Sequence, residues 1–310
     1  MNDLLTNLEK SDTDELAYAD DLAMIIAGQT KAEVKHRVEQ AIDVVENWCQ
    51  SAKLKISTEK SQLLNVGRLD FDLEILIDKV EVERVASLKY LGVMIDKSMK
   101  WMDHLNMVSK KVDKCIKTFN FMKFMNPLMS IDSLRVLYNQ LMVPIVSYGS
   151  KVWYEDIKFK YQRKLIEGFQ RKTLLSLSKA YRTTSTVKLK SLFRVIDLNK
   201  QIEFLEYDSG TRESKIKEEL VACDLNVNYG QVRCKELIWF IVDHGPFRSY
   251  LFRFNLADDD TCRFCLEDVE SPSHLLFSCC KFDRFPSNNV EELEMKSKYI
   301  TIEIFKLNKL

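Results

Sequence analysis

The hydrophobic periodicity of the chain changes near Asp96, and this change constrains the fold more than any other feature. Before Asp96, short apolar runs typical of strands surround one amphipathic pattern, which predicts a helix over 31–53. After Asp96, apolar residues recur every three or four positions and predict three helices, over 104–124, 131–146 and 158–177. We therefore expect an α+β region followed by a small helical bundle. The runs that predict strands are 62–66, 73–77, 80–82 and 89–95.

Composition excludes several classes of protein. The 310 residues are 46% hydrophobic and 30% charged, with only 8 Gly and 5 Pro, which excludes collagen-like and fully disordered chains. No stretch approaches the ~20 apolar residues of a membrane span, and residues 1–10 lack the apolar core of a signal peptide. Eight Cys are too few for a secreted disulfide scaffold. We expect no membrane association and an intracellular location, nuclear or cytoplasmic.

The charge is balanced overall but unevenly distributed. The 46 basic and 46 acidic residues cancel, whereas residues 1–21 hold one basic and seven acidic residues, and residues 151–200 hold thirteen basic and four acidic ones. A basic middle segment can follow a phosphate backbone, but a solvated helical face would have the same composition. The distribution of charge alone supports the two interpretations equally. The basic residues that we single out as candidates for binding nucleic acid are Arg163, Lys164, Arg171 and Lys172.

An acidic pair lies between two apolar segments, 16–18 and 22–26, in a pattern that predicts a β-hairpin. Asp20 and Asp21 would then lie at its tip, where a tight turn directs both carboxylates toward one point. Hard oxygen ligands of this kind hold divalent cations, and phosphoryl transfer uses such cations to bridge the attacking and leaving oxygens. The alternative is an acidic turn without a function.

A second constellation lies near the carboxyl end of the sequence: Cys262-x-x-Cys265, eight residues, His274, four residues and Cys279. A Cys-x-x-Cys turn with a His and a further Cys supplies four tetrahedral ligands, and thiolates with imidazole suit Zn²⁺ better than Mg²⁺ or Ca²⁺. Cys280 is an alternative fourth ligand. All four positions would be filled by protein, so we expect a structural zinc site. The alternative is four unrelated residues with free thiols.

Several segments, in order along the chain, resemble the reverse transcriptases of LINE-type, non-long-terminal-repeat retrotransposons. Tyr18-Ala19-Asp20-Asp21-Leu22, between apolar strands and before a helix, resembles the catalytic hairpin of that family. Residues 54–61 resemble the next motif of the polymerase palm, with Ser57 where Asn is usual. Further resemblance lies in Lys89-Tyr90-Leu91-Gly92-Val93, Ile95-Asp96, Trp101-x-x-His104, residues 181–186, and His244-Gly245-Pro246-Phe247 with Tyr250-Leu251 and Arg253-Phe254.

The resemblance implies an RNA-directed DNA polymerase that uses Mg²⁺, with an RNA template and a DNA primer or target as partners. It implies that Asp20 and Asp21 hold the catalytic metal ions and that Lys60 protonates the leaving pyrophosphate. Tyr18, Tyr90, Leu91 and Gly92 would contact the substrate or seat the primer end. The Cys-Cys-His-Cys segment would be a finger that contacts nucleic acid.

The same resemblance implies that part of the enzyme is missing. A complete palm has a third metal-binding Asp and a Gly-rich substrate motif, both before the hairpin, whereas 17 residues precede Tyr18 here. We therefore expect a truncated, carboxy-terminal part that is inactive alone. The alternatives are a non-catalytic nucleic-acid-binding protein and a decayed fragment; the oligomeric state stays open. The expected domains are a partial palm (1–96), a helical thumb (97–200), a helical connector (201–256), the zinc finger (257–285) and a charged tail (286–310).

Overall fold

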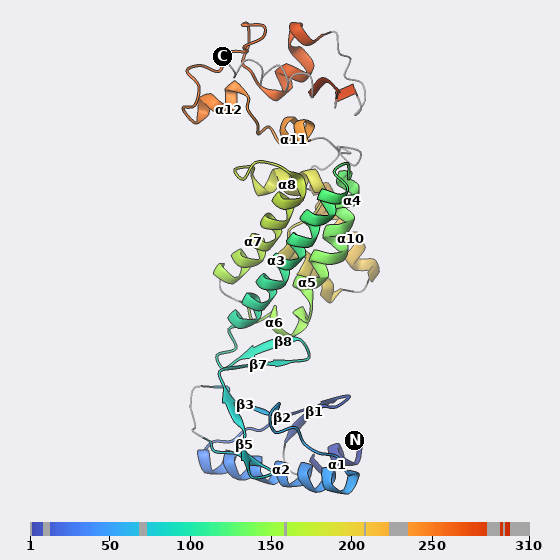
Figure 1. Cartoon of the computed structure of the whole chain (residues 1–310), viewed down its shortest axis with the longest axis vertical. Helices are drawn as coiled ribbons and strands as arrows, with labels where there is room; N and C mark the ends of the chain where they lie inside the picture. The colour runs from blue at the N-terminus through green and yellow to red at the C-terminus, as the bar shows by residue number, and fades with distance from the viewer. Residues whose placement is uncertain are drawn as a thin grey trace. The chain divides into compact units, whose positions relative to one another are not determined.

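The computed structural model describes residues 2–8, 13–67, 73–157, 160–207, 209–222, 235–283, 292–293 and 295–297. The chain separates into two compact units, residues 1–104 and 105–310. The first contains small sheets and helices, and the second is mainly helical, so the fold is α+β (Figure 1). No helix in the described parts of the chain is long and apolar enough to cross a membrane.

The described residues of the first unit form four two-stranded sheets and two helices. Three of the strand pairs are antiparallel, and the pair β3–β6 is parallel. Its elements, in chain order, are α1 (Asn2–Leu8), β1 (Asp14–Tyr18), β2 (Asp21–Ile25), α2 (Lys31–Ala52), β3 (Gln62–Leu64), β4 (Leu76–Ile77), β5 (Val80–Glu81), β6 (Glu83–Val85), β7 (Ser87–Tyr90) and β8 (Val93–Asp96).

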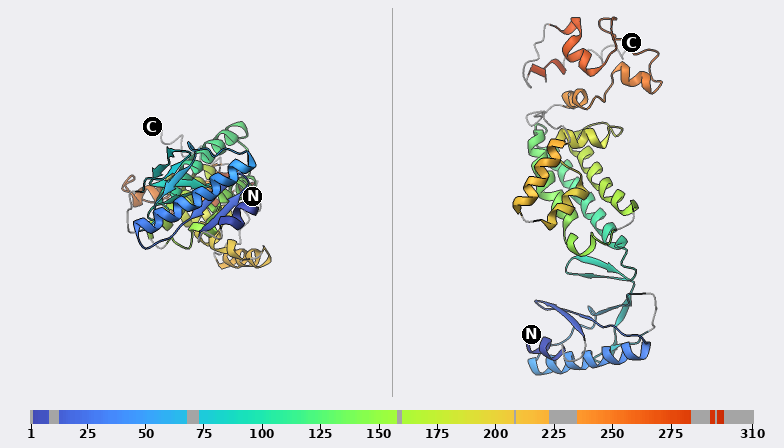
Figure 2. Two further views of the ribbon diagram at one scale, coloured as in Figure 1. Left: turned by 90° about the horizontal axis from the view of Figure 1, so that it is seen from below. Right: turned by 180° about the vertical axis from the view of Figure 1, so that it is seen from behind.

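Helix α2 organises the core of the first unit, as its apolar periodicity predicts. The side chain of Thr30 accepts a hydrogen bond from the Glu33 amide and so caps the first turn. The helix ends at Lys53, whose backbone is left-handed. Figures 1 and 2 show α2 extended along one side of the strands. Its buried face packs in two clusters, one with Leu73, Ile75 and Val82, and one with Leu4 and Leu8.

Two of the predicted strands differ from the structure. The run 89–95 is a hairpin, β7–β8, in which Leu91 and Gly92 form the turn with φ of 44° and 86°. Two successive positive φ values are typical of a type I′ turn, which suits glycine at its second position. In the run 73–77 only Leu76–Ile77 is a strand, while Leu73 and Ile75 are buried without pairing in a sheet.

The second unit begins with a helical bundle in which α3 and α7 lie side by side (Figure 1). The predicted helix over 131–146 is interrupted by a π-helical turn, Tyr138–Met142, just before Pro144. Proline has no backbone N–H to donate, so the regular ladder cannot continue through it. The helices are α3 (Met102–Met125), α4 (Ile131–Leu137), α5 (Val143–Ser147), α6 (Ser150–Trp153), α7 (Lys160–Ser178), α8 (Thr186–Phe193), α9 (Leu198–Glu203), α10 (Ser209–Ala222), α11 (Lys235–Ile241) and α12 (Arg248–Arg253).

The Cys/His segment follows α12 and has little regular structure. It contains an isolated bridge between Thr261 and Val269, a π-helical turn at His274–Ser278 and a 3₁₀ turn at Cys280–Phe282. Most of the predicted charged tail, 286–310, lies outside the described residues, as does the predicted helix start at residue 158.

Candidate functional site

The predicted acidic hairpin forms from β1 and β2. Tyr18 pairs with Asp21, so Ala19 and Asp20 make a two-residue turn, and Asp21 begins β2. Ala19 has a φ of 54°, a left-handed conformation that costs a residue with a side chain roughly 1–2 kcal/mol. Both carboxylates are exposed, as is Tyr18 at 66%. The strained turn thus presents two adjacent oxygen ligands to solvent.

Two further carboxylates lie on β1, but at the opposite end of the hairpin. Asp14 pairs with Ile25 and Glu15 pairs with Met24. At about 3.3 Å per residue, they lie roughly 10–13 Å along the strand from Tyr18. Catalytic metal pairs are only about 4 Å apart, so neither side chain is placed to share a cation with the tip.

The predicted primer-side residues lie beside this hairpin. The hydroxyl of Tyr90, at the end of β7, donates a hydrogen bond of 3.1 Å to the Leu16 carbonyl in β1. Leu91 and Gly92 follow as the turn of the β7–β8 hairpin. The structure therefore brings Tyr90 to the acidic hairpin, although the two segments are far apart in sequence.

Lys60 is not joined to the acidic pair. It lies in an exposed turn before β3, and its amide donates to the Ser57 carbonyl. In the described part of the chain, none of the side chains of Lys60, Asp20 and Asp21 makes a hydrogen bond or ion pair. The role of Lys60 in catalysis thus stays a prediction.

Asp96 stabilises the connection from β8 to α3. Its carboxylate accepts hydrogen bonds from the amides of Ser98 (3.0 Å), Lys100 (3.3 Å) and Trp101 (2.7 Å), and from the Ser98 hydroxyl (2.5 Å). Burial alone would raise the pKa of this carboxyl, but these hydrogen bonds hold it below its usual value. Trp101 is buried, and the Nδ1 atom of the buried His104 accepts from the Met94 amide. These residues, part of the resemblance, therefore have a structural role here.

Cys262, Cys265, His274 and Cys279 converge on one point, and their ligand atoms all lie within 4.8 Å of one another. The Cys262 and Cys279 sulfurs are 4.0 Å apart, and Cys265 Sγ lies 3.3 Å from His274 Nε2. A tetrahedral zinc with Zn–S of about 2.3 Å requires S···S of roughly 3.8 Å, so the four residues fit a metal ion. Cys279 is buried in this cluster, whereas Cys280 is exposed and outside it.

The electrostatics of the cluster also suit a cation. Burial would raise the pKa of Cys265, but hydrogen bonds from the Glu267 and Asp268 amides, together with Cys262 and His274, lower it to about 7. Burial and the neighbouring Cys262 raise the pKa of Cys279 to about 12. Deprotonation of all three thiols would bring like charges together, and a dication bound there would offset their repulsion. The Nδ1 atom of His274 lies 3.5 Å from Asp268 Oδ2 but makes no hydrogen bond among the described residues.

Comparison with known proteins shows which proteins the chain is similar to. Residues 1–95 match the family described as reverse transcriptase (RNA-dependent DNA polymerase). Over 94% of its length, the chain is 24% identical to a Pol polyprotein from the type-1 retrotransposable element R1 2 of Nasonia vitripennis. These likenesses support a LINE-type reverse transcriptase. No solved structure matches it.

The chain covers different shares of its relatives. It spans 84% of the Nasonia polyprotein, but 17% of a putative 115 kDa protein in the R1DM element of Drosophila melanogaster, to which it is 27% identical over 57% of its own length. It spans 16% of a probable RNA-directed DNA polymerase from the Drosophila transposon BS, at 22% identity over 47% of its length. The chain thus spans far less than two thirds of two of these three relatives.

A buried ion pair, absent from the sequence-based predictions, fixes the Cys/His segment. Glu270 is fully buried, and its carboxylate binds Arg263 through Nε and a terminal nitrogen, each at 2.8 Å. It also accepts from the Arg263 amide (3.1 Å) and the Arg248 amide (2.9 Å). Arg263 further donates to the Pro246 carbonyl. Because Arg263 lies inside the Cys262–Cys265 turn, these bonds join that turn to the start of α12.

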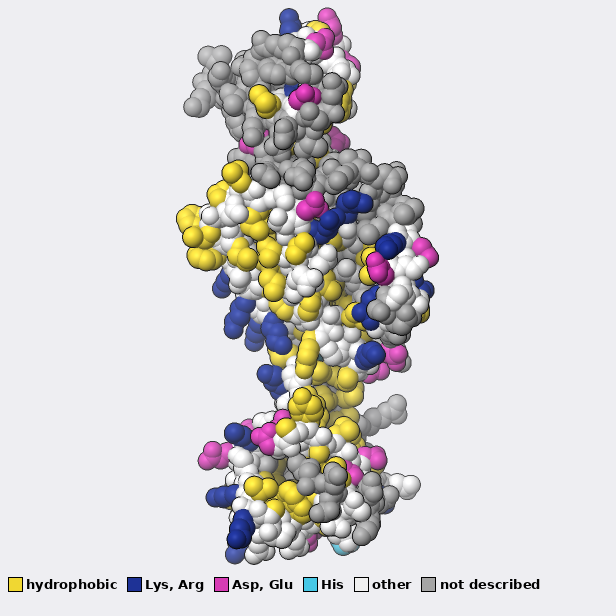
Figure 3. Space-filling view, turned by 90° about the vertical axis from the view of Figure 1, so that its right-hand side faces the viewer, with side chains coloured by type: hydrophobic (Ala, Val, Ile, Leu, Met, Phe, Trp, Pro, Cys, Tyr) yellow, Lys and Arg dark blue, Asp and Glu magenta, His cyan; other side chains and the backbone are white. Residues whose placement is uncertain are grey.

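The four basic residues predicted to bind nucleic acid have different surroundings. Arg171 donates to the carbonyls of Thr184 and Arg182 and to the Thr186 hydroxyl. Lys172 makes a 2.5 Å ion pair with Asp113 of α3, and Arg163 lies 3.9 Å from Glu203. Lys164 is exposed and has no ion-pair or hydrogen-bond partner among the described residues. Figure 3 shows Lys and Arg side chains at several places on the helical unit, with one group at its lower left.

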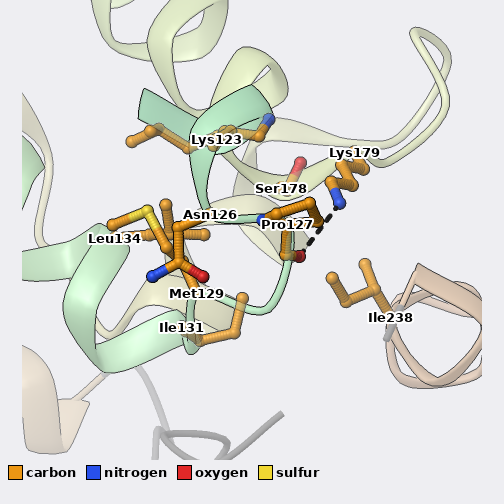
Figure 4. A pocket seen from close by; sticks show the side chains of 10 residues that line it. Lys123, Asn126, Pro127, Met129, Ile131, Leu134, Ser178, Lys179 and Ile238 are labelled. Carbon is orange, nitrogen blue, oxygen red and sulfur yellow. Dashed lines mark hydrogen bonds between the residues drawn. The ribbon is translucent and has the colours of Figure 1, made fainter. Parts of the chain in front are cut away.

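A small pocket at the end of α3 holds two further lysines (Figure 4). Burial, followed by the charge of Lys179, lowers the pKa of Lys123 to about 8. Lys123 donates to the Ser176 carbonyl, and Lys179 lies 3.5 Å from the Pro127 carbonyl. The cavity is about 10 Å³, room for one water molecule, so both lysines have a structural role.

Proposed function

We propose that the chain supplies the end of the palm, the thumb and a zinc finger of an RNA-directed DNA polymerase encoded by a LINE-type retrotransposon. The observation that carries this proposal is the Asp20–Asp21 turn with Tyr90 bonded to the same hairpin. The match of residues 1–95 to the reverse transcriptases supports it. Residues 1–96 are the partial palm, 97–200 the thumb, 201–256 a connector and 257–285 the finger.

In this proposal Asp20 and Asp21 hold Mg²⁺ together with a carboxylate from another strand. Mg²⁺ held there would supply charge stabilisation at the reacting phosphate, while Asp20 and Asp21 would fix its position. Tyr90, fixed on Leu16, and the adjoining turn at Leu91 and Gly92 seat the primer end, with Tyr18 beside it. Lys60 reaches the leaving pyrophosphate when the nucleotide is bound and acts as its general acid.

The same geometry leads us to propose that this chain does not polymerise alone. The tip of the hairpin offers two carboxylates, and Asp14 and Glu15 lie at its far end. Without a third ligand, the metal pair is not fixed where the phosphate reacts. Phosphoryl transfer depends on positioning and charge stabilisation, and each ~1.4 kcal/mol lost from barrier lowering slows it tenfold.

The partners in this proposal are an RNA template and a DNA primer or target, held by the basic thumb and the finger. Zinc at Cys262, Cys265, His274 and Cys279 is structural, since protein supplies all four ligands. The finger presents its surrounding surface rather than its metal to the nucleic acid.

Primer extension tests the proposal. The purified chain, with an oligo(dT)–poly(rA) substrate and Mg²⁺, is expected to bind the substrate but not to extend it. Addition of the upstream palm and fingers on a separate chain should restore extension that Asp20→Ala abolishes and Asp14→Ala leaves intact. If the chain alone extends the primer and Asp20→Ala abolishes that extension, the proposal that the chain is inactive alone is wrong. Failure to bind the substrate at low salt would overturn the proposed function.

A further inference from the structure

Helix α7 contains a glycine in its interior that packing does not explain. Gly168 has helical backbone, so no special conformation requires glycine there. A Cβ atom added at this position would meet no atom within 4 Å, so no close contact with a neighbouring element requires it either. Glycine destabilises a helix interior relative to alanine, and it is favoured where a ligand approaches the backbone closely. Gly168 is therefore a position at which a ligand can approach the backbone of α7 closely.

A hollow of about 490 Å³ lies over this glycine. Lys164 and Arg171 lie four residues before and three residues after Gly168, on the same face of α7. Lys190 of α8 and Asp197 line the other side. The hollow thus combines bare helix backbone with cationic groups on two helices of one unit.

Arg171 supplies a fixed charge to this hollow. Its guanidinium donates to the Thr184 carbonyl (2.8 Å), the Arg182 carbonyl (2.6 Å) and the Thr186 hydroxyl (2.9 Å). All three acceptors are neutral, so they hold the side chain in place without neutralising it. A preorganised charge of this kind binds an anion without the entropy cost of ordering a free side chain.

The other charges leave the hollow cationic. Lys190 lies 3.3 Å from Asp197, whose other oxygen caps α9 by accepting from the Asn199 amide. Lys164 has no partner within the described residues, and Glu167 is the second acidic residue in the lining. Three cations, Lys164, Arg171 and Lys190, against two carboxylates, Glu167 and Asp197, give a net charge of +1.

We propose that this hollow binds the phosphodiester backbone of a nucleic acid strand, with one phosphate seated against Gly168 between Lys164 and Lys190. The inference rests on the proposed function, which makes a nucleic acid the partner of the thumb. It adds Gly168 and Lys190 to the predicted basic residues and assigns Arg171 a fixed charge beside the phosphate. A strand fits better than a free anion because Lys164, Gly168 and Arg171 form a line along the helix face.

Substitution of Gly168 separates binding from stability. Gly168→Ala should raise the denaturant midpoint of the full chain, since the new methyl group meets open space and alanine favours the helix. The same change should weaken binding of a fluorescent 20-nucleotide RNA, and Gly168→Leu should weaken it by roughly tenfold, the loss of one charge-assisted contact. Higher stability with unchanged binding in both variants would overturn the proposal.

Removal of single charges tests whether the lysines that line the hollow bind the nucleic acid. Lys164→Gln and Lys190→Gln should each lower the affinity and reduce the salt slope of binding by about one. Lys188→Gln is the matched control because Lys188 is on the same helix as Lys190 but pairs with Asp243 outside the hollow. An equal loss in Lys188→Gln would show that only general charge matters and would overturn the site.

Competition identifies the ligand. Unlabelled RNA and DNA strands should displace the probe with affinities that rise with strand length, while inorganic phosphate and poly-glutamate should compete weakly. Equal displacement by inorganic phosphate would show a free-anion site, and equal displacement by poly-glutamate would show a site for acidic peptides; either result overturns the proposal. If Gly168→Leu binds nucleic acid as tightly as the wild-type chain does, this site is refuted but the proposed function is not. A wild-type chain that binds no nucleic acid at low salt refutes the proposed function as well.

Discussion

Replacement of Glu270 by glutamine tests whether the buried ion pair holds the Cys/His segment together. The carboxylate is fully buried and accepts four hydrogen bonds, three from Arg263 and one from the Arg248 amide. Glutamine puts an NH₂ group in place of one oxygen. That group faces two donors, so two hydrogen bonds are lost and Arg263, whose side chain is 13% exposed, loses its charged partner.

The expected cost is large for a nearly isosteric change. A buried pair broken by removal of one partner loses about 3–5 kcal/mol. At ~1.4 kcal/mol per tenfold, local opening of residues 244–279 should become roughly 100- to 4,000-fold more frequent. The bundle of α3 and α7 makes none of these contacts and should be unaffected.

Hydrogen exchange followed by mass spectrometry measures this opening peptide by peptide in the full chain. Asp259→Asn is the control: it removes the same charge from a residue that pairs with Arg248 but is 51% exposed, and it should cost at most about 1 kcal/mol. If Glu270→Gln exchanges no faster than Asp259→Asn across 244–279, the ion pair does not stabilise this segment.

Three further predictions follow from particular contacts. Chelation of the metal should unfold residues 257–283 while the helical bundle persists, because binding energies on the order of 10–16 kcal/mol at such sites are largely folding energy. Purified protein that contains no zinc by elemental analysis, and in which the three cysteine ligands all react with a thiol label, would refute the metal site. Asp96→Ala should destabilise the first unit by about 2 kcal/mol, since it leaves the buried Trp101 amide without its acceptor. The folded pKa of Asp96 lies below its ordinary value of 3.8. The extra free energy of unfolding of the wild type over Asp96→Ala should therefore be complete above about pH 4 and be lost as the pH falls through the folded pKa. A difference in stability that does not change with pH in acid denaturation would contradict this. Arg171→Gln should loosen residues 181–186, visible as faster limited proteolysis there, whereas the exposed Lys164→Gln should not.

Sequence patterns predicted the elements that are specified by residues close together in the sequence. The hairpin at Asp20 and Asp21 and the helix α2 follow from apolar spacing and turn residues within about twenty positions, and both are present. The Cys-x-x-Cys spacing likewise predicted the cluster, although only the fold separates the buried Cys279 from the exposed Cys280. The hairpin β7–β8 was missed because its turn contains Leu91, an apolar residue in a left-handed conformation, so the run looked continuous.

The functions of single charges were least predictable, because their partners are distant in sequence. Arg163, Arg171 and Lys172 looked alike as members of a basic segment, yet Lys172 pairs with Asp113 on another helix and Arg171 orders the loop 182–186. Reversal of all four predicted charges would therefore disturb the bundle and the loop together with any contact to nucleic acid. Lost binding in such a variant would say little about the interface, because the fold would have changed as well. Substitutions at Gly168 and Lys164 avoid this difficulty, since one meets open space and the other has no partner in the described structure. A basic composition thus identifies the segment, but only the contacts separate the cations that bind a ligand from those that hold the helices together.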